Sequence, residues 1–142
     1  MLTSIHISHV FVTDQDQALD FYVNKLGLEV SDDMDLGFMR WLTVRVPGDE
    51  SRVVLLEKAA PPSMDEEAAA QVRELVAKGA SGFAVGFTTD DCRKTFEDLK
   101  SRGVEFTQEP VEQFYGTDIG IRDPFGNHIR IVQFAPVPAG QP

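Results

Sequence analysis

The stretches VFVTDQDQALDFYVNKLGLEV, at residues 10–30, and GFTTDDCRKTFEDLKSRGVEF, at residues 86–106, align without a gap. Gly27 matches Gly103, and the offset of 76 residues between these positions holds throughout. Each copy predicts a strand, a helix that begins at an Asp or Thr cap and ends at a glycine, and a second strand. Such a repeat predicts two similar modules in one chain.

The positions of the helices are predicted from their capping residues and from the glycines that end them. One is expected from about Gln15 to Lys25 and its equivalent from about Asp91 to Arg102. Between the copies, the sequence Ser63-x-x-Glu66 is typical of a capping box and predicts a connecting helix from about Met64 to Lys78.

Two further strands are predicted in each half by alternating or continuous apolar residues. These strands are expected at residues 37–47, 51–58, 115–122 and 127–134. The fold class is therefore α+β, built from two βαβββ modules. The expected organisation is a first module at 1–60, a connecting helix at 61–80, a second module at 81–135 and a Pro-rich flexible tail at 136–142, as a single domain overall.

The charge composition restricts the classes of molecule that the protein can bind. The chain has 13 Lys and Arg residues against 23 Asp and Glu residues, a net charge of -10, which argues against nucleic acid and anionic membranes. No apolar run has the length of a signal peptide or membrane span, and a single cysteine cannot cross-link a secreted fold, so a cytoplasmic protein is expected. Cys92 follows two carboxylates, and we interpret it as an inert thiol.

The order of strand, Asp14, Ala-Leu-Asp-Phe-Tyr and Leu-Gly-Leu, with Asp-Pro-x-Gly-Asn before the last strand, resembles the vicinal oxygen chelate superfamily. This superfamily includes glyoxalase I, bleomycin resistance proteins and extradiol dioxygenases. The resemblance implies a pseudo-twofold arrangement in which mixed β-sheet curls into a cleft with the helices outside, and commonly a homodimer. It leaves the reaction open, because this fold hosts lyases, dioxygenases, epimerases and drug-binding proteins.

Strand alternation predicts which side chains enter this cleft. Large residues such as Phe83, Val85 and Phe87, and the series Leu42, Val44 and Val46, are expected to pack on the helices. The opposite parity gives the following expected ligand-binding residues: Ile7, His9, Phe11, Met39, Trp41, Leu55, Ala84, Gly86, His128 and Arg130, with Phe114 or Tyr115 as a further wall.

The superfamily's enzymes usually hold a divalent metal with four side chains, mostly His and Glu. The positions that match here are Ile7, about Leu55, Ala84 and Arg130, and none of these side chains can bind a cation. A register shifted by two residues offers His9 and Glu57 but no ligand in the second half. We therefore expect no metal or other cofactor, with a divalent ion at His9 and Glu57 as the alternative.

Three functions remain open at this stage. The first is a binding protein that sequesters a flat, partly aromatic molecule in a metal-free cleft, as bleomycin resistance proteins do. The second is an enzyme, a lyase, isomerase or dioxygenase with or without metal, in which His9 or Glu57 acts as a general base. The third is a protein whose cleft is vestigial. Arg130 has two interpretations, a cation paired with a neighbouring carboxylate or an anchor for a ligand oxygen.

Overall fold

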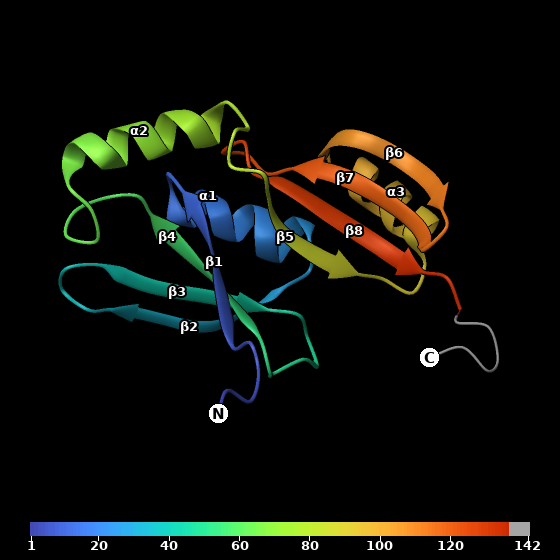
Figure 1. The fold of residues 1–142 in the computed structure, drawn as a ribbon, viewed down its shortest axis with the longest axis horizontal. Helices are drawn as coiled ribbons and strands as arrows, with labels where there is room; N and C mark the ends of the chain where they lie inside the picture. The colour runs from blue at the N-terminus through green and yellow to red at the C-terminus, as the bar shows by residue number, and fades with distance from the viewer. Residues whose placement is uncertain (137–142) are drawn as a thin grey trace. The chain divides into compact units, whose positions relative to one another are not determined.

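The computed structural model describes residues 1–136 (Figure 1). Its contacts form two compact units. Unit 1 comprises Met1–Gly82 with Pro124–Asn127, and unit 2 comprises Phe83–Asp123 with the residues from His128 on. A flexible tail is expected at 136–142, and its residues after Pro136 lie outside the described part of the chain. Within the described part of the chain, no helix is long and apolar enough to cross a membrane.

Unit 1 contains a four-stranded sheet in the order β1-β4-β3-β2, coloured blue to green in Figure 1. β1 is parallel to β4, and the other pairs are antiparallel. The elements are β1 (Ile7–Val12), α1 (Gln15–Leu19), η1 (Asp20–Lys25), β2 (Glu29–Asp35), β3 (Arg40–Arg45), β4 (Val53–Lys58) and α2 (Glu66–Ala77).

Unit 2 repeats this plan with the strand order β5-β8-β7-β6. Its elements are β5 (Phe83–Thr88), α3 (Cys92–Ser101), β6 (Glu105–Gln113), β7 (Gly116–Arg122) and β8 (His128–Phe134). The bounds of β1, 7–12, become those of β5, 83–88, when the offset of 76 residues is added. The two βαβββ modules and the α+β class are therefore confirmed.

The repeated aspartates cap the N-termini of the helices α1 and α3. Asp14 accepts a hydrogen bond from the Gln17 amide at 2.9 Å, and Asp91 accepts one from the Lys94 amide at 3.0 Å. Both side chains satisfy an amide that has no partner inside the helix. The helix expected at 15–25 is present, but its second half, η1, is π-helical rather than α-helical.

The capping box expected at Ser63 is wrong. Asp65 is the N-cap of α2 and accepts from the Ala68 amide at 2.8 Å, whereas the Ser63 hydroxyl donates to the carbonyl oxygen of Ala60. The side chain of Asp65, two residues after Ser63 and directly before the first helical residue, caps the helix instead, and the chain from Ala60 to Ser63 forms a separate turn.

The predicted alternation appears in both sheets. In unit 1 the buried residues on the face that packs on α1 and η1 are Val10, Val12, Leu42, Val44 and Leu56. In unit 2 the equivalent buried residues, on the strands that contact α3, are Ile119, Ile121, Ile129 and Ile131. Each such side chain contributes about 1.5–3 kcal/mol when it is fully buried.

Two residues depart from this prediction. Val46 lies beyond the end of β3 and is 43% exposed. Phe83 is 67% exposed, because a register shift between Phe83 and Val85 interrupts the pairing of β5 with β8. The bulge turns the Phe83 ring toward Gly86, where its Cε2 atom lies 3.8 Å from the position that a Cβ would occupy. Phe83 therefore shares a face with Gly86 instead of with Val85 and Phe87.

The Asp-Pro-x-Gly turn before β8 packs against α2 within unit 1. Gly126 has a positive φ of 111°, and a Cβ at this position would collide with the carbonyl oxygen of Val76. Asn127 then donates from Nδ2 to the carbonyl oxygen of Phe11 at 2.8 Å. The turn therefore needs a residue without a side chain at this position for both backbone and packing reasons.

Candidate functional site

The face of the unit 1 sheet opposite α1 contains the first group of predicted site residues. The strand register places His9 opposite Leu55, Leu55 opposite Thr43, and Phe11 opposite Glu57. These side chains therefore share a face, which we call the His9 face and which consists of Ile7, His9, Phe11, Trp41, Thr43, Leu55 and Glu57.

His9 and Glu57 are the two candidate catalytic residues, and the structure brings them together. His9 Nε2 lies 3.9 Å from Glu57 Oε2, and the two side chains are 45% and 16% exposed. The His9 ring meets the Phe11 ring edge to face, with 4.5 Å between centroids. At this separation the pair is an ion pair only when His9 is protonated, and a ligand has access to the imidazole.

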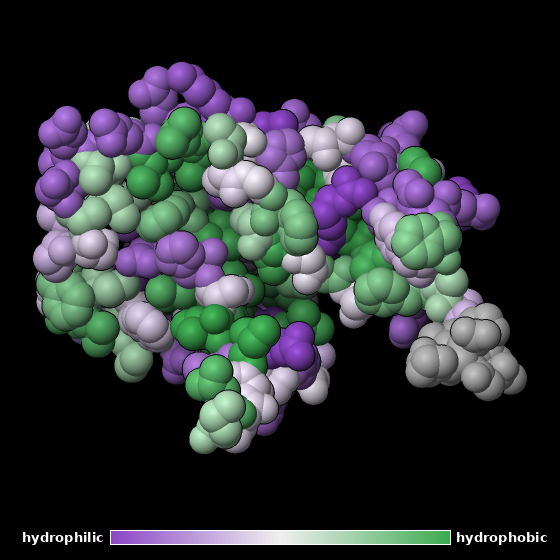
Figure 2. Space-filling view, viewed as in Figure 1, coloured by the Kyte–Doolittle hydropathy of each residue, from purple (hydrophilic) through white to green (hydrophobic). Residues whose placement is uncertain are grey.

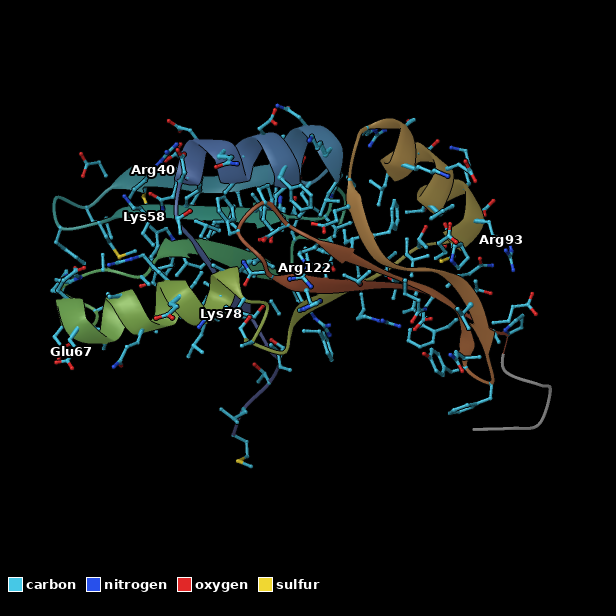
Figure 3. All side chains as sticks on the ribbon, turned by 90° about the horizontal axis from the view of Figure 1, so that it is seen from above. Arg40, Lys58, Glu67, Lys78, Arg93 and Arg122 are labelled. Atoms are coloured by element: carbon cyan, nitrogen blue, oxygen red, sulfur yellow. The ribbon has the colours of Figure 1, made fainter. Side chains whose placement is uncertain are left out.

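A cavity of about 390 Å³ lies in unit 1 beside the end of β4. Its lining is partly apolar and partly charged, and the ten residues are Gln15, Phe38, Met39, Arg40, Glu57, Lys58, Ala60, Pro61, Pro62 and Ser63. Figure 3 labels Arg40 and Lys58, which lie near each other at this end of the sheet. Figure 2 shows that apolar and hydrophilic residues alternate over the surface of unit 1 below α2.

Sequence reasoning found only Met39 and Glu57 among these lining residues. The contribution of Phe38 and of residues 60–63 was missed, because parity applies to strands and these residues lie in loops. The Pro61-Pro62 pair before the connecting helix was the available signal, since two prolines stiffen a loop.

The charged side chains that line the cavity differ in whether they are already paired with other residues of the chain. Arg40 donates to both oxygens of Asp33 at 2.9 Å and to Asp16 at 2.8 Å, and its hydrogen bonds hold the pKa of the Asp33 carboxyl below its usual range. Arg40 is thus committed to two carboxylates. Glu57, whose contact with His9 is long at 3.9 Å, is the lining carboxylate that remains available to a ligand.

The second group of predicted site residues lies in unit 2, on the sheet face opposite α3. The register aligns Gly86 with Arg130, Arg130 with Gly120, and Gly120 with Gln108, in one row across all four strands. We call this the Arg130 face, and it consists of Gly86, Gln108, Asp118, Gly120, His128 and Arg130.

A hydrogen-bonded network occupies the centre of the Arg130 face. Arg130 Nη2 donates to Asp118 Oδ2 at 2.6 Å and to Gln108 Oε1 at 3.2 Å. The Tyr115 hydroxyl donates to the same Asp118 oxygen at 2.7 Å, and Gln108 Nε2 donates to Asp118 Oδ1 at 2.8 Å. Of the two interpretations of Arg130, the paired cation is realised in this structure.

This network determines the protonation of its members. Burial disfavours the charged form of Asp118, but donors from Tyr115, Arg130 and Gln108 outweigh it, so the pKa of Asp118 is below its ordinary value. The hydrogen bond to this carboxylate raises the pKa of Tyr115. Asp118 is therefore a carboxylate and Tyr115 a neutral phenol at neutral pH.

The remaining predicted residues have diverse environments. Phe114 is 97% exposed at the turn between β6 and β7, where its ring meets that of Tyr115 edge to face at 5.2 Å. Ala84 lies in the bulge of β5 and is half-buried. Cys92 is fully buried, and desolvation raises the pKa of its thiol, as an unreactive cysteine requires.

The residues present do not fit a four-ligand metal centre. Ile7, Leu55 and Ala84 have no lone pair to offer, and Arg130 is a cation already paired with Asp118. Across residues 1–136, no group of three or more His, Cys, Asp or Glu side chains is arranged to hold a metal ion. His9 and Glu57 are two ligands without a third.

The fold and these residue patterns identify the family. A model of the Glyoxalase/Bleomycin resistance protein/Dioxygenase superfamily matches residues 4–131, and the chain belongs to this superfamily, which has the vicinal oxygen chelate fold. The chain is 35% identical over 130 residues to the uncharacterized protein YurT of Bacillus subtilis (strain 168), covering 91% of this chain and 98% of YurT.

Two solved structures extend the comparison. UcmS2 is 39% identical to this chain with a TM-score of 0.88, over 93% of this chain and 98% of UcmS2. TnmS3, described as an antibiotic binding protein from Streptomyces sp. CB03234, is 26% identical with a TM-score of 0.75, over 94% of this chain and 98% of TnmS3.

Proposed function

We propose that this protein binds a small, flat, partly aromatic organic molecule without the help of a metal, as a sequestration or resistance protein does. The observation that carries the proposal is the cavity of about 390 Å³ in unit 1. Its volume lies within the range of about 300–1,000 Å³ that is usual for small-molecule sites. Phe38, Met39 and two prolines supply apolar walls, and Glu57 supplies a polar group that orients a ligand.

Three further observations bear on this proposal. The positions at which the superfamily's enzymes hold a metal are occupied by residues that cannot bind one, so the binding of substrate oxygens to a metal is not available. TnmS3, an antibiotic binding protein, shares the fold over nearly the whole chain. The net charge of -10 favours a neutral or cationic ligand.

A second candidate function is an enzyme in which Glu57 or His9 removes a proton. The observation that favours it is the 3.9 Å separation of these two side chains, one of which lines the cavity. The two functions differ in the fate of the ligand. A binding protein returns its ligand unchanged, whereas an enzyme converts it, so mass spectrometry of the ligand after prolonged incubation separates them.

Filling the cavity tests the proposal. Ala60→Phe places a ring among the lining residues, and Ala70→Phe, on the exposed side of α2, is the matched control. We expect Ala60→Phe to weaken the binding of any ligand found by a thermal-shift screen of aromatic compounds at least tenfold, and Ala70→Phe to leave it unchanged. Equal affinities for the two variants would place the ligand elsewhere.

A further inference from the structure

We infer that the cavity of unit 1 binds an aromatic amine in its protonated form, with the ring against the apolar walls and the ammonium group at the Glu57 carboxylate. This inference rests on the proposed function and adds a chemical class of ligand to it. All residues that carry it belong to unit 1.

Glu57 is a carboxylate that lacks a hydrogen-bond donor. Its contact with His9 Nε2 is 3.9 Å, too long for a hydrogen bond, although the Glu57 side chain is only 16% exposed. Among residues 1–136 every buried side-chain oxygen has a partner, so the unpartnered Glu57 oxygens are accessible, and Glu57 lines the cavity. A largely buried carboxylate is stabilised by any donor that reaches it, and a charged donor stabilises it most.

Gln15 adds a second acceptor to the same cavity. Its Nε2 donates to the carbonyl oxygens of Leu56 at 2.9 Å and Arg40 at 3.1 Å, so both hydrogens of the amide are used. The reverse orientation of the amide would bring Oε1 against two carbonyl oxygens. Within the described part of the chain Oε1 has no hydrogen-bond partner, and it is the atom that Gln15 can offer to a ligand.

Ser63 offers its oxygen in the same way. The hydroxyl donates to the carbonyl oxygen of Ala60 at 2.8 Å, which leaves the lone pairs of Ser63 as acceptors. Gln15, Glu57 and Ser63 therefore present acceptors to the cavity, and no hydrogen of theirs remains to donate. A primary ammonium group has three N–H donors and no acceptor, so it matches this lining.

The cations of the lining are compatible with a cationic ligand. Arg40 is paired with both Asp33 and Asp16, so this group has two negative charges against one positive charge. Lys58 is exposed, and water screens its charge more strongly than the charge of the largely buried Glu57. The electrostatic attraction at Glu57 therefore outweighs the repulsion from Lys58.

The test compares three probes with one ring system: 1-naphthylmethylamine, a cation at neutral pH, 1-methylnaphthalene, which is neutral, and 1-naphthylacetate, an anion. Calorimetry on wild-type protein should show that the amine binds at least about tenfold more tightly than 1-methylnaphthalene, since a hydrogen bond to a charged group contributes this much. The acetate should bind more weakly than either. This comparison depends on no substitution.

Glu57→Gln keeps the shape of the side chain and removes its charge. It should reduce the preference for the amine over 1-methylnaphthalene to below about threefold. Because this preference is a ratio of two affinities in one variant, a general loss of binding does not imitate the result. Glu67→Gln on α2, labelled in Figure 3, makes the same change of net charge at an exposed position outside the lining and should reproduce the wild-type preference.

The possible failures are distinct. The inference would be overturned, and the proposed function left standing, by equal binding of the amine and 1-methylnaphthalene to wild-type protein or by an unchanged preference in Glu57→Gln. The same holds for an equal loss of preference in Glu67→Gln, or for tighter binding of the acetate than of the amine, which would assign the cavity to an anion at Lys58. If wild-type protein binds none of the three probes, the proposed aromatic ligand class fails and the inference fails with it.

Discussion

Arg130 Nη2 lies 2.6 Å from Oδ2 of Asp118 on the adjacent strand, and Asp118 is only 3% exposed. The ion pair stands at one of the positions where the resemblance to metalloenzymes implied a metal ligand. In this chain the cation at that position is the guanidinium group of Arg130 and not a metal ion. The pair therefore satisfies a buried carboxylate without any metal.

Removing the cation should destabilise the fold. Arg130→Met leaves the buried Asp118 carboxylate with neutral donors only, and we expect the free energy of unfolding to fall by about 1–3 kcal/mol. Arg93→Met removes an arginine from an exposed ion pair with Glu112 and should cost less than about 1 kcal/mol. Chemical denaturation measures both variants, and equal losses would show that the buried pair adds nothing to stability.

The Asp118 carboxylate should make the free energy of unfolding depend on pH in the acid range. Because the pKa of folded Asp118 lies below its ordinary value of 3.8, its stabilisation is complete above that value and is lost as the pH falls through the folded pKa. Unfolding measured between about pH 5 and pH 2 should therefore show a steeper acid limb for wild type than for Asp118→Asn. Parallel acid limbs would mean that Asp118 does not retain its charge in the folded state.

Gly126 should be intolerant of a side chain. Gly126→Ala places a methyl group against the carbonyl oxygen of Val76 in a backbone region that L-residues avoid, whereas Gly48, with a φ of 87°, has open space around it. Both alanine variants should lose about 1–2 kcal/mol to backbone strain. Gly126→Ala should lose about 1–3 kcal/mol more from the collision, and a thermal melt that ranks the variants in the reverse order would contradict this packing.

Cys92 should be chemically silent in the native state. Its side chain is fully buried and desolvation raises the pKa of its thiol, so little thiolate is present at neutral pH. A chromogenic disulfide reagent should label native protein far more slowly than protein unfolded in guanidinium. Labelling at comparable rates would indicate that α3 opens readily at its first turn.

The sequence repeat was sufficient to predict the two modules, because helix caps, glycines and strand alternation are local features that occur twice. Alternation also assigned His9, Glu57 and Arg130 to sheet faces. The prediction from alternation failed at Phe83, because a bulge in β5 reverses the side-chain direction and no single residue type indicates a bulge. The partner of Arg130 could not be predicted, because Asp118 and Gln108 reach it through strand register, which the sequence pattern alone does not specify.

Binding of a flat aromatic molecule without a metal can be tested directly by fluorescence. Trp41, the single tryptophan, belongs to the His9 face, so its fluorescence reports on a ligand there. Titration of chelator-treated protein with a panel of flat aromatic compounds should give saturable quenching by at least one compound, with one ligand per chain and unchanged affinity after addition of zinc, nickel or manganese. Failure of every compound to bind saturably, or binding only after a metal is restored, would contradict metal-free binding of an aromatic ligand.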